Sequence, residues 1–243
     1  YRDFSALFDR SDAYKKIVRT DVKIDSKKIH TLQAGIDTEK FNKSYKNMEI
    51  WNEYNIPKEA TKALYVGRLT KEKNFPLLLE LWKQYYESSK EKNIYLIVLG
   101  GDVDVSLFER YYIKSLGVKR CQALSEIYAS SDVFLFPSTT DTLGQVVMEA
   151  MSSGLPVIVS DKGGPTTLIV EDQRNGYAID TRDQNSWLKM IGELMEDKTF
   201  RDELGENGHK LIAKMGIADS FEVFWNEHLK YASTCEYEKR AIF

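Results

Sequence analysis

Two cationic side chains, Arg68 and Lys73, stand in a short segment between an apolar run and an amphipathic one. A guanidinium can bind the oxygens of a diphosphate in bidentate fashion, and an ammonium acts there as a point charge. Each contact contributes roughly 4 kcal/mol of Coulomb attraction at about 4 Å and an effective dielectric near 20, before desolvation is subtracted. The segment is a candidate diphosphate site, and the alternative is a solvated turn formed by Lys71, Glu72 and Lys73.

Asp141 belongs to a second polar segment, residues 137–144, which follows another apolar run. A helix that begins at Thr142 or Leu143 would direct unpaired N–H groups and the positive end of its dipole outward, which favours a phosphate or an ionised sugar group. Gly144 lacks a side chain at the point where a ligand needs close backbone approach. The alternative role for Asp141 is to cap the N-terminus of this helix.

Glu149 follows Asp141 by eight residues and stands within an otherwise apolar helical stretch. A carboxylate in such a stretch needs partners, and the two hydroxyls of a ribose would donate hydrogen bonds to it. The alternative is an ion pair between Glu149 and a nearby Lys or Arg. A third polar segment, residues 160–165, contains Gly163 and Gly164 and leads into a further helix.

Short apolar runs predict the strands that position these segments. Their continuous apolarity is typical of strands buried on both faces of a parallel sheet, and they cover residues 28–32, 63–66, 94–99, 133–136, 157–159 and 177–179. Helical patterns over residues 74–89 and 144–153 alternate with them. The sequence therefore predicts an α/β fold with a doubly wound, Rossmann-like parallel sheet. Carboxyl-terminal helices follow over residues 185–232, with expected breaks at Gly205, Gly208 and Gly216.

The carboxyl ends of the strands are where ligands bind in such sheets, because the loops there lead into helix N-termini. Each of the three polar segments follows a predicted strand. We therefore expect the three segments to meet at one edge of the sheet and to form a single site.

The charge and cysteine content of the 243 residues exclude several classes of function. Lys and Arg number 34 against 37 Asp and Glu, and a net charge of -3 gives no field that would hold a nucleic acid. Cys121 and Cys235 stand in no metal-ligand or disulfide spacing, so no metal is predicted and a reducing compartment is favoured. No apolar run approaches the roughly 20 residues that span a bilayer.

Four motifs occur in an order that is typical of one protein family. They are Gly35-Ile36-Asp37 with Phe41, Gly67-Arg68-Leu69 with Lys73, Phe136-Pro137-Ser138 followed by Glu149-Ala150-Met151-Ser152-Ser153-Gly154-Leu155-Pro156-Val157, and Gly163-Gly164. On these motifs, residues 29–229 resemble the carboxyl-terminal, nucleotide-sugar-binding half of a GT-B glycosyltransferase of family 4, the group 1 retaining glycosyltransferases.

The resemblance implies a role for each candidate residue. Arg68 and Lys73 would bind the diphosphate of the donor, and Glu149 would bind its ribose. Asp141 would contact hydroxyls of the transferred sugar, which makes Asp141 and Glu149 the expected catalytic pair. Further contacts to sugar and phosphate would come from the backbone of Thr142, Leu143 and Gly144.

The implied reaction transfers a sugar from a nucleoside-diphosphate sugar of UDP or GDP type, with retention of anomeric configuration. The expected acceptor is a glycan, a lipid-linked sugar or another cell-envelope molecule. Fixed cations and helix dipoles can neutralise the leaving nucleoside diphosphate, so the resemblance implies neither a metal nor a cofactor. It also implies a cytoplasmic protein, and it leaves peripheral contact with the inner face of the membrane open.

The resemblance further predicts how the chain is divided. Residues 1–25 are expected to be a residual segment or hinge from a preceding acceptor domain, residues 26–232 the donor-binding domain, and residues 233–243 a carboxyl-terminal tail. A GT-B enzyme has a first domain that binds the acceptor, and the expectation is that this domain is missing before Tyr1. The chain alone is then expected to bind its donor but hardly to transfer the sugar.

Two departures from the family pattern support a second hypothesis. Asp141 stands where the family usually has Glu, with a side chain about one methylene shorter, and Thr167 also stands in place of a common Glu. The alternative function is a non-catalytic module that binds a sugar nucleotide through Arg68, Lys73 and Glu149. A nicotinamide-dependent dehydrogenase is disfavoured, because no GxGxxG motif follows a first strand.

Overall fold

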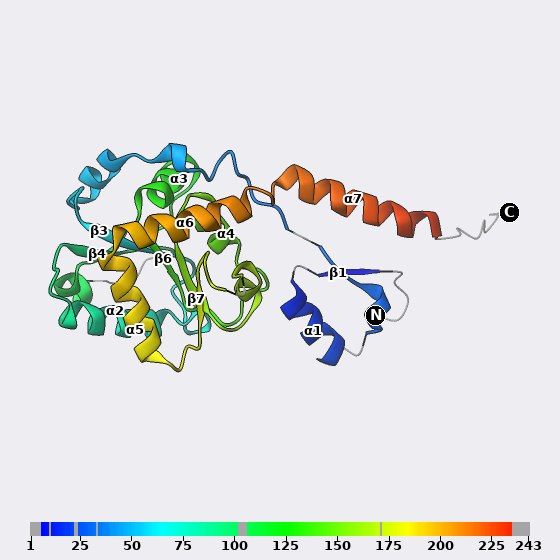
Figure 1. Ribbon diagram of the computed structural model, residues 1–243, viewed down its shortest axis with the longest axis horizontal. Coiled ribbons are helices and arrows are strands. Elements are labelled where there is room, and N and C mark those ends of the chain that lie inside the picture. The colour runs from blue at the N-terminus through cyan, green and yellow to red at the C-terminus, as the bar shows by residue number, and fades with distance from the viewer. Residues whose placement is uncertain are drawn as a thin grey trace.

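The computed structural model describes residues 6–9, 11–21, 24–32, 34–101, 106–170 and 172–234. Six parallel strands form the main sheet in the order β5-β4-β3-β6-β7-β8, and helices pack on it (Figure 1). The strands are β3 (Thr61–Val66), β4 (Ile94–Leu99), β5 (Ile113–Ser115), β6 (Val133–Phe136), β7 (Val157–Ser160) and β8 (Tyr177–Ile179). The predicted doubly wound, Rossmann-like α/β sheet is confirmed.

The predicted strands at 63–66, 94–99, 133–136, 157–159 and 177–179 all belong to this sheet, with ends displaced by two residues at most. Every residue of β4, β6 and β7 is buried, as expected of strands covered on both faces. The apolar pattern does not predict β5. This strand has three residues and, within the described ranges, pairs only with β4, because it lies at the edge of the sheet.

In the part of the chain that the structure describes, five helices pack around the sheet, and the patterns over 74–89 and 144–153 are confirmed as two of them. The helices are α2 (Phe75–Ser88), α3 (Cys121–Ser130), α4 (Gln145–Ser152), α5 (Gln184–Glu196) and α6 (Lys198–Ile212). α2 packs against α5, and α4 packs against α6. Short 3-10 turns connect these elements: η1 (Ser26–Lys28), η2 (Lys43–Tyr45), η3 (Met48–Tyr54), η4 (Lys71–Lys73), η5 (Ser106–Tyr111) and η6 (Gly164–Leu168).

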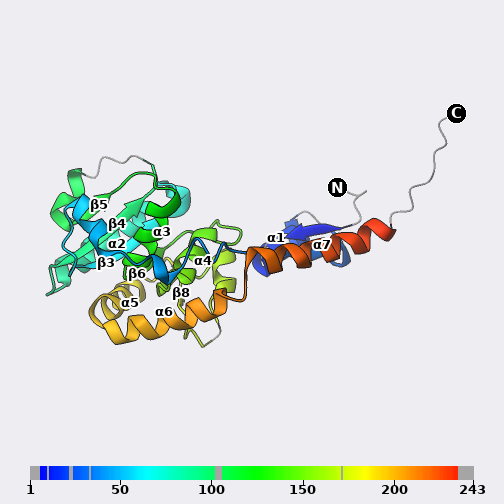
Figure 2. The same cartoon turned by 90° about the horizontal axis from the view of Figure 1, so that it is seen from above.

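One predicted strand lies outside the main sheet. β2 (Ile29–Thr31) pairs in parallel with β1 (Leu7–Asp9), and α1 (Asp12–Asp21) connects them. The expectation that residues 28–32 join the main sheet is therefore wrong, because an apolar run predicts a strand but not its neighbour. Figure 2 shows this unit beside α7 (Ile217–Thr234), and the rings of Phe8 and Phe224 meet edge to face at 5.7 Å.

The predicted carboxyl-terminal helices are confirmed, but their breaks differ. A break precedes α7 at Gly216, as expected, whereas Gly205 and Gly208 lie inside α6 and the prediction of breaks there is wrong. A Cβ atom at Gly205 would lie 2.2 Å from the carbonyl oxygen of Gly154, so this glycine permits close packing of α6. The unpredicted break is at Asp197, whose side chain accepts a hydrogen bond from the N–H of Phe200.

Several predictions concern residues beyond the described ranges. Residues 1–5 of the predicted leading segment, and residues 235–243 of the predicted tail with Cys235, lie there. Residues 233 and 234 continue α7. Within the described ranges, no helix combines the length and apolarity needed to span a lipid bilayer.

The strand order places a topological switch point between β3 and β6. From β3 the chain proceeds outward to β4 and β5, then returns to β6 on the other side of β3. The loops after β3 and β6 therefore leave the sheet side by side, at the position where open α/β sheets bind their ligands. These loops carry Arg68, Lys73 and Asp141.

Candidate functional site

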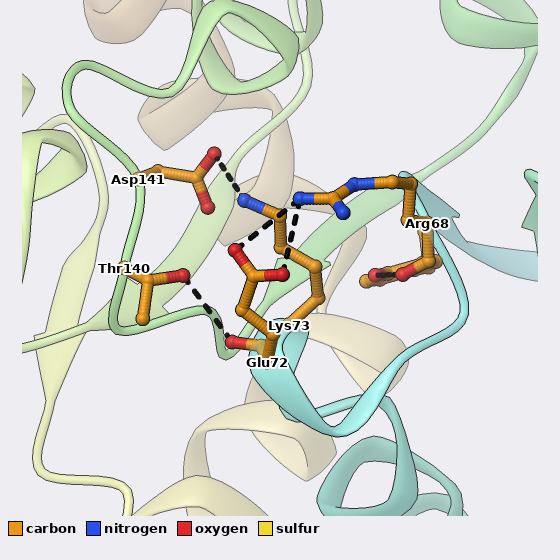
Figure 3. Close-up of polar contacts among 6 residues, drawn as sticks. Arg68, Glu72, Lys73, Thr140 and Asp141 are labelled. Atoms are coloured by element: carbon orange, nitrogen blue, oxygen red, sulfur yellow. Dashed lines mark hydrogen bonds and ion pairs between the residues drawn. The ribbon is translucent and has the colours of Figure 1, made fainter.

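The loops after β3 and β6 are joined by three polar contacts. The Lys73 ammonium and the Asp141 carboxylate lie 2.9 Å apart (Figure 3). The Thr140 hydroxyl donates to the carbonyl of Glu72 at 3.3 Å, and the Asn74 side-chain amide donates to the carbonyl of Pro137 at 2.9 Å. The predicted meeting of these two loops at one edge of the sheet is what the structure shows.

Lys73 points toward Asp141 in the loop after β6 (Figure 3), whereas Lys71 in the same turn is exposed. The next residue, Asn74, has a left-handed backbone (φ 52°), ends the turn η4 and begins α2. Only 13% of the Lys73 side chain and 20% of the Asp141 side chain are exposed to solvent. The alternative of a solvated turn is therefore correct for Lys71 but wrong for Lys73.

Arg68 belongs to the same loop as Lys73 but is much more exposed. Its guanidinium contacts Glu72 at 3.2 Å, and 66% of its side chain is exposed. Such exposed pairs contribute about 0–1 kcal/mol, so the guanidinium can exchange this carboxylate for another anion at little cost. The sequence analysis missed Glu72 as a site residue, although its spacing of four from Arg68 is a signal for such a pair.

Asp141 is not the N-cap of α4. That position belongs to Gly144, which has φ 86°, and no side chain caps the helix there. A positive φ is strained for residues other than glycine, which explains Gly144 at this turn. Asp141 instead has one oxygen on Lys73, and its other oxygen is buried without a hydrogen-bond partner among the described residues.

The third predicted loop also reaches the site. The N–H of Gly164 donates to the carbonyl of Asp141 at 2.7 Å, and a Cβ atom at Gly164 would lie 1.9 Å from the carbonyl oxygen of Thr142. That same carbonyl accepts a hydrogen bond from the Ser11 hydroxyl at 2.6 Å. Thr142 is exposed, while the side chain of Leu143 is buried in the core, which leaves only the Leu143 backbone for a ligand.

Glu149 lies in α4 and accepts a hydrogen bond from the Tyr128 hydroxyl at 2.9 Å. Within the described part of the chain, no Lys or Arg forms an ion pair with it, so the ion-pair alternative is wrong. Burial raises the pKa of Glu149, and the Tyr128 hydrogen bond and the Lys40 charge partly counteract this increase. Tyr128 is a residue that the sequence analysis missed, because nothing in the pattern of α3 distinguishes it from a core tyrosine.

The structure therefore brings Arg68, Lys73 and Asp141 together and places Glu149 separately, beside Tyr128. Across the described ranges, no group of three or more His, Cys, Asp or Glu side chains could hold a metal ion. The arrangement offers two cations and the free N–H groups at the start of α4 to an anion, and carboxylate oxygens to hydroxyl groups.

Comparison with known proteins identifies relatives of this fold and sequence. Residues 47–211 match the family described as Glycosyl transferases group 1. The sulfoquinovosyl transferase SQD2 of Arabidopsis thaliana is 34% identical over 178 residues, which cover 71% of this chain and 34% of that protein. The D-inositol 3-phosphate glycosyltransferase of Corynebacterium diphtheriae is 28% identical over 162 residues, 62% of this chain and 38% of that protein.

A solved structure with the same fold is that of Anabaena Alr3699/HepE in complex with UDP and glucose. It superposes with a TM-score of 0.77 at 17% identity, over 93% of this chain and 63% of that chain. The present chain thus spans well under half of the two curated relatives and less than two thirds of this structure.

Proposed function

Because the chain belongs to the group 1 glycosyltransferases, we propose that it is the donor-binding half of a retaining enzyme that transfers a sugar from a nucleoside-diphosphate sugar. The observation that carries this proposal is the meeting of the loops after β3 and β6, where Lys73 contacts Asp141, Arg68 lies in the same loop as Lys73, and α4 begins shortly after Asp141. UDP and glucose are the ligands of the similar HepE structure, which supports a donor of this class.

Charge stabilisation is the main chemical task of this half. When the bond between sugar and diphosphate breaks, negative charge develops on the leaving nucleoside diphosphate. Lys73 and Arg68 would neutralise that charge, with the N–H groups at the start of α4, and no metal ion would be required. Attack by the acceptor on the same face of the sugar would then give retention.

Two carboxylates would orient the donor. Asp141 would accept hydrogen bonds from hydroxyls of the transferred sugar, and the free oxygen of Glu149 would accept them from the ribose. The backbone of Thr142, Leu143 and Gly144 would approach sugar and phosphate. The acceptor would be a glycan, a lipid-linked sugar or another cell-envelope molecule. A first domain would bind it, and the longer relatives have room for such a domain. The chain alone would bind the donor but hardly transfer its sugar. We place the reaction in the cytoplasm.

Binding of candidate donors is the direct test of this function. Thermal shift and calorimetry with UDP-, GDP- and ADP-sugars should show stabilisation by one nucleotide class, because a ligand that binds only the folded chain raises its melting temperature. Absence of binding by all three classes would contradict the proposal. Tight binding without transfer by the full-length protein would favour the non-catalytic module.

Arg68→Ala is expected to weaken binding of the corresponding nucleoside diphosphate by about two- to fivefold, because an exposed cation in high dielectric contributes little. The effect should shrink as salt is added. Arg110→Ala is a matched control, since Arg110 forms a similarly exposed pair with Glu87 at 3.7 Å. Calorimetry in which both variants bind like the unmodified chain would remove Arg68 from the site.

Glu149→Gln is expected to weaken nucleotide binding about ten- to hundredfold, because hydrogen bonds to a charged acceptor are each worth roughly 1.5–3 kcal/mol. Its stability should not fall. Burial raises the pKa of Glu149 in the folded chain above the ordinary 4.5. The folded state therefore favours the protonated carboxyl, and the free energy of unfolding decreases as pH rises through the raised pKa. Glutamine avoids this loss, and the variant should therefore melt at the same or a higher temperature at neutral pH.

The control for this variant is Glu80→Gln, which alters an exposed helical glutamate that also bonds a neutral side chain, Gln84. Calorimetry and thermal melting should both be unchanged in it. A large drop in the melting temperature of Glu149→Gln with intact nucleotide binding would return Glu149 to a structural role.

A further inference from the structure

The Lys73–Asp141 pair contains a conflict that the proposed donor must resolve. The diphosphate is expected to bind the Lys73 ammonium, but Asp141 already holds that ammonium at 2.9 Å. Both side chains are largely buried, so their charges are poorly screened by solvent. An anion that reaches Lys73 therefore also meets the negative charge of Asp141 at short range, and like charges brought together cost several kcal/mol.

Asp141 also has an unsatisfied oxygen. Its second carboxylate oxygen is buried and has no hydrogen-bond partner among the described residues, and the same is true of the Ser138 hydroxyl in the same loop. A buried acceptor without a donor is costly, and a ligand that brings hydroxyl groups would remove that cost. A bare diphosphate carries no such hydroxyl at the end that faces Lys73, whereas a sugar attached to it does.

From these two observations we propose that Asp141 determines specificity, making the site prefer the intact nucleotide sugar over the nucleoside diphosphate that remains after transfer. This inference rests on the proposed function. With the sugar in place, its hydroxyls donate to Asp141 and offset the repulsion from the diphosphate. After transfer the hydroxyls are gone, the repulsion remains, and Asp141 competes with the product for Lys73, which favours release of the product.

The test compares two affinities in one variant. For the unmodified chain and Asp141→Asn, calorimetry measures the dissociation constants of UDP and GDP and of UDP-glucose and GDP-glucose. The asparagine keeps the shape and removes the charge. The affinity for the bare diphosphate should rise about tenfold in the variant, while that for the nucleotide sugar should stay or fall, so their ratio should change by tenfold or more.

Glu72→Gln is the matched control, because it removes a carboxylate from the exposed Arg68 pair in the same loop as Lys73. It should change the affinities for both ligands alike and leave their ratio unaltered. Asp141→Glu, which keeps the charge, should retain the preference for the nucleotide sugar. If Asp141→Asn does not fold, Asp141→Ser removes the same charge and has a smaller side chain. Independently of both variants, the unmodified chain must bind the nucleotide sugar more tightly than the diphosphate.

The outcomes separate this inference from the proposed function. An unmodified chain that prefers the bare diphosphate, or an unchanged ratio in Asp141→Asn with binding intact, would overturn the role of Asp141 and leave the donor site standing. Failure of the unmodified chain to bind any of these four ligands, or any ADP-sugar, would instead contradict the proposed function.

Discussion

Lys73→Ala should weaken the binding of a nucleoside diphosphate by about 100-fold or more, equivalent to about 2.7 kcal/mol. The variant removes a largely buried ammonium, and charge-assisted hydrogen bonds in such places are roughly twice as strong as neutral ones. It also leaves Asp141 without its cation, so the incoming anion meets an uncompensated carboxylate. Calorimetry with UDP and GDP measures the effect.

The loss of the pair should also lower stability, since breaking a buried ion pair costs up to about 3–5 kcal/mol and this pair is partly exposed. The double variant Lys73→Ala with Asp141→Asn separates the two effects, because it removes both charges. It should recover most of the thermal stability but only the part of the affinity, about tenfold, that the uncompensated Asp141 carboxylate removes. Lys71→Ala, in the same turn but exposed, should bind like the unmodified chain. A double variant that binds the diphosphate normally would show that Lys73 serves only the fold.

Gly164→Ala should abolish detectable donor binding, with at least a 100-fold loss of affinity. Its Cβ atom would lie 1.9 Å from the backbone oxygen of Thr142, and a backbone atom cannot turn aside as a side chain can. The loops after β6 and β7 must then separate, which strains the 2.7 Å hydrogen bond from Gly164 to the carbonyl of Asp141. A misplacement of about 1 Å can cost a catalysed reaction a factor of about 100 in rate, and we expect a loss of similar size in donor affinity.

Gly101→Ala is the control for this steric argument, because an added Cβ atom there meets no atom of the described residues within 4 Å. It lies in the loop that follows β4 and should leave binding and melting temperature unchanged. Gly164→Ala should melt at a lower temperature than both the unmodified chain and Gly101→Ala. If it binds UDP or GDP with normal affinity, the position of the Asp141 loop does not depend on its contact with Gly164.

Much of the architecture could be predicted from the chain, since continuous apolar runs reveal strands that are buried on both faces. Two elements show the limit of that signal. β5 is short and lies at an edge, so it carries no long apolar run, and β2 carries one but pairs with β1 in another sheet. Gly205 shows a further limit of prediction from the sequence. A glycine weakens an isolated helix, but Gly205 lies inside α6 because the close contact with Gly154 leaves no room for a side chain.

The types of group at the site were determined by the sequence alone: two cations after one strand, a carboxylate after another, and a buried-helix glutamate. The tertiary structure decided which groups interact. Lys73 and Asp141 are 68 residues apart, Glu149 and Tyr128 are 21 apart, and Ser11 and Thr142 are 131 apart. The Lys73–Asp141 contact exists only because β3 and β6 are neighbours in the sheet. Burial then sets the effective dielectric and so the strength of each electrostatic interaction, and the order of residues in the sequence does not encode that burial.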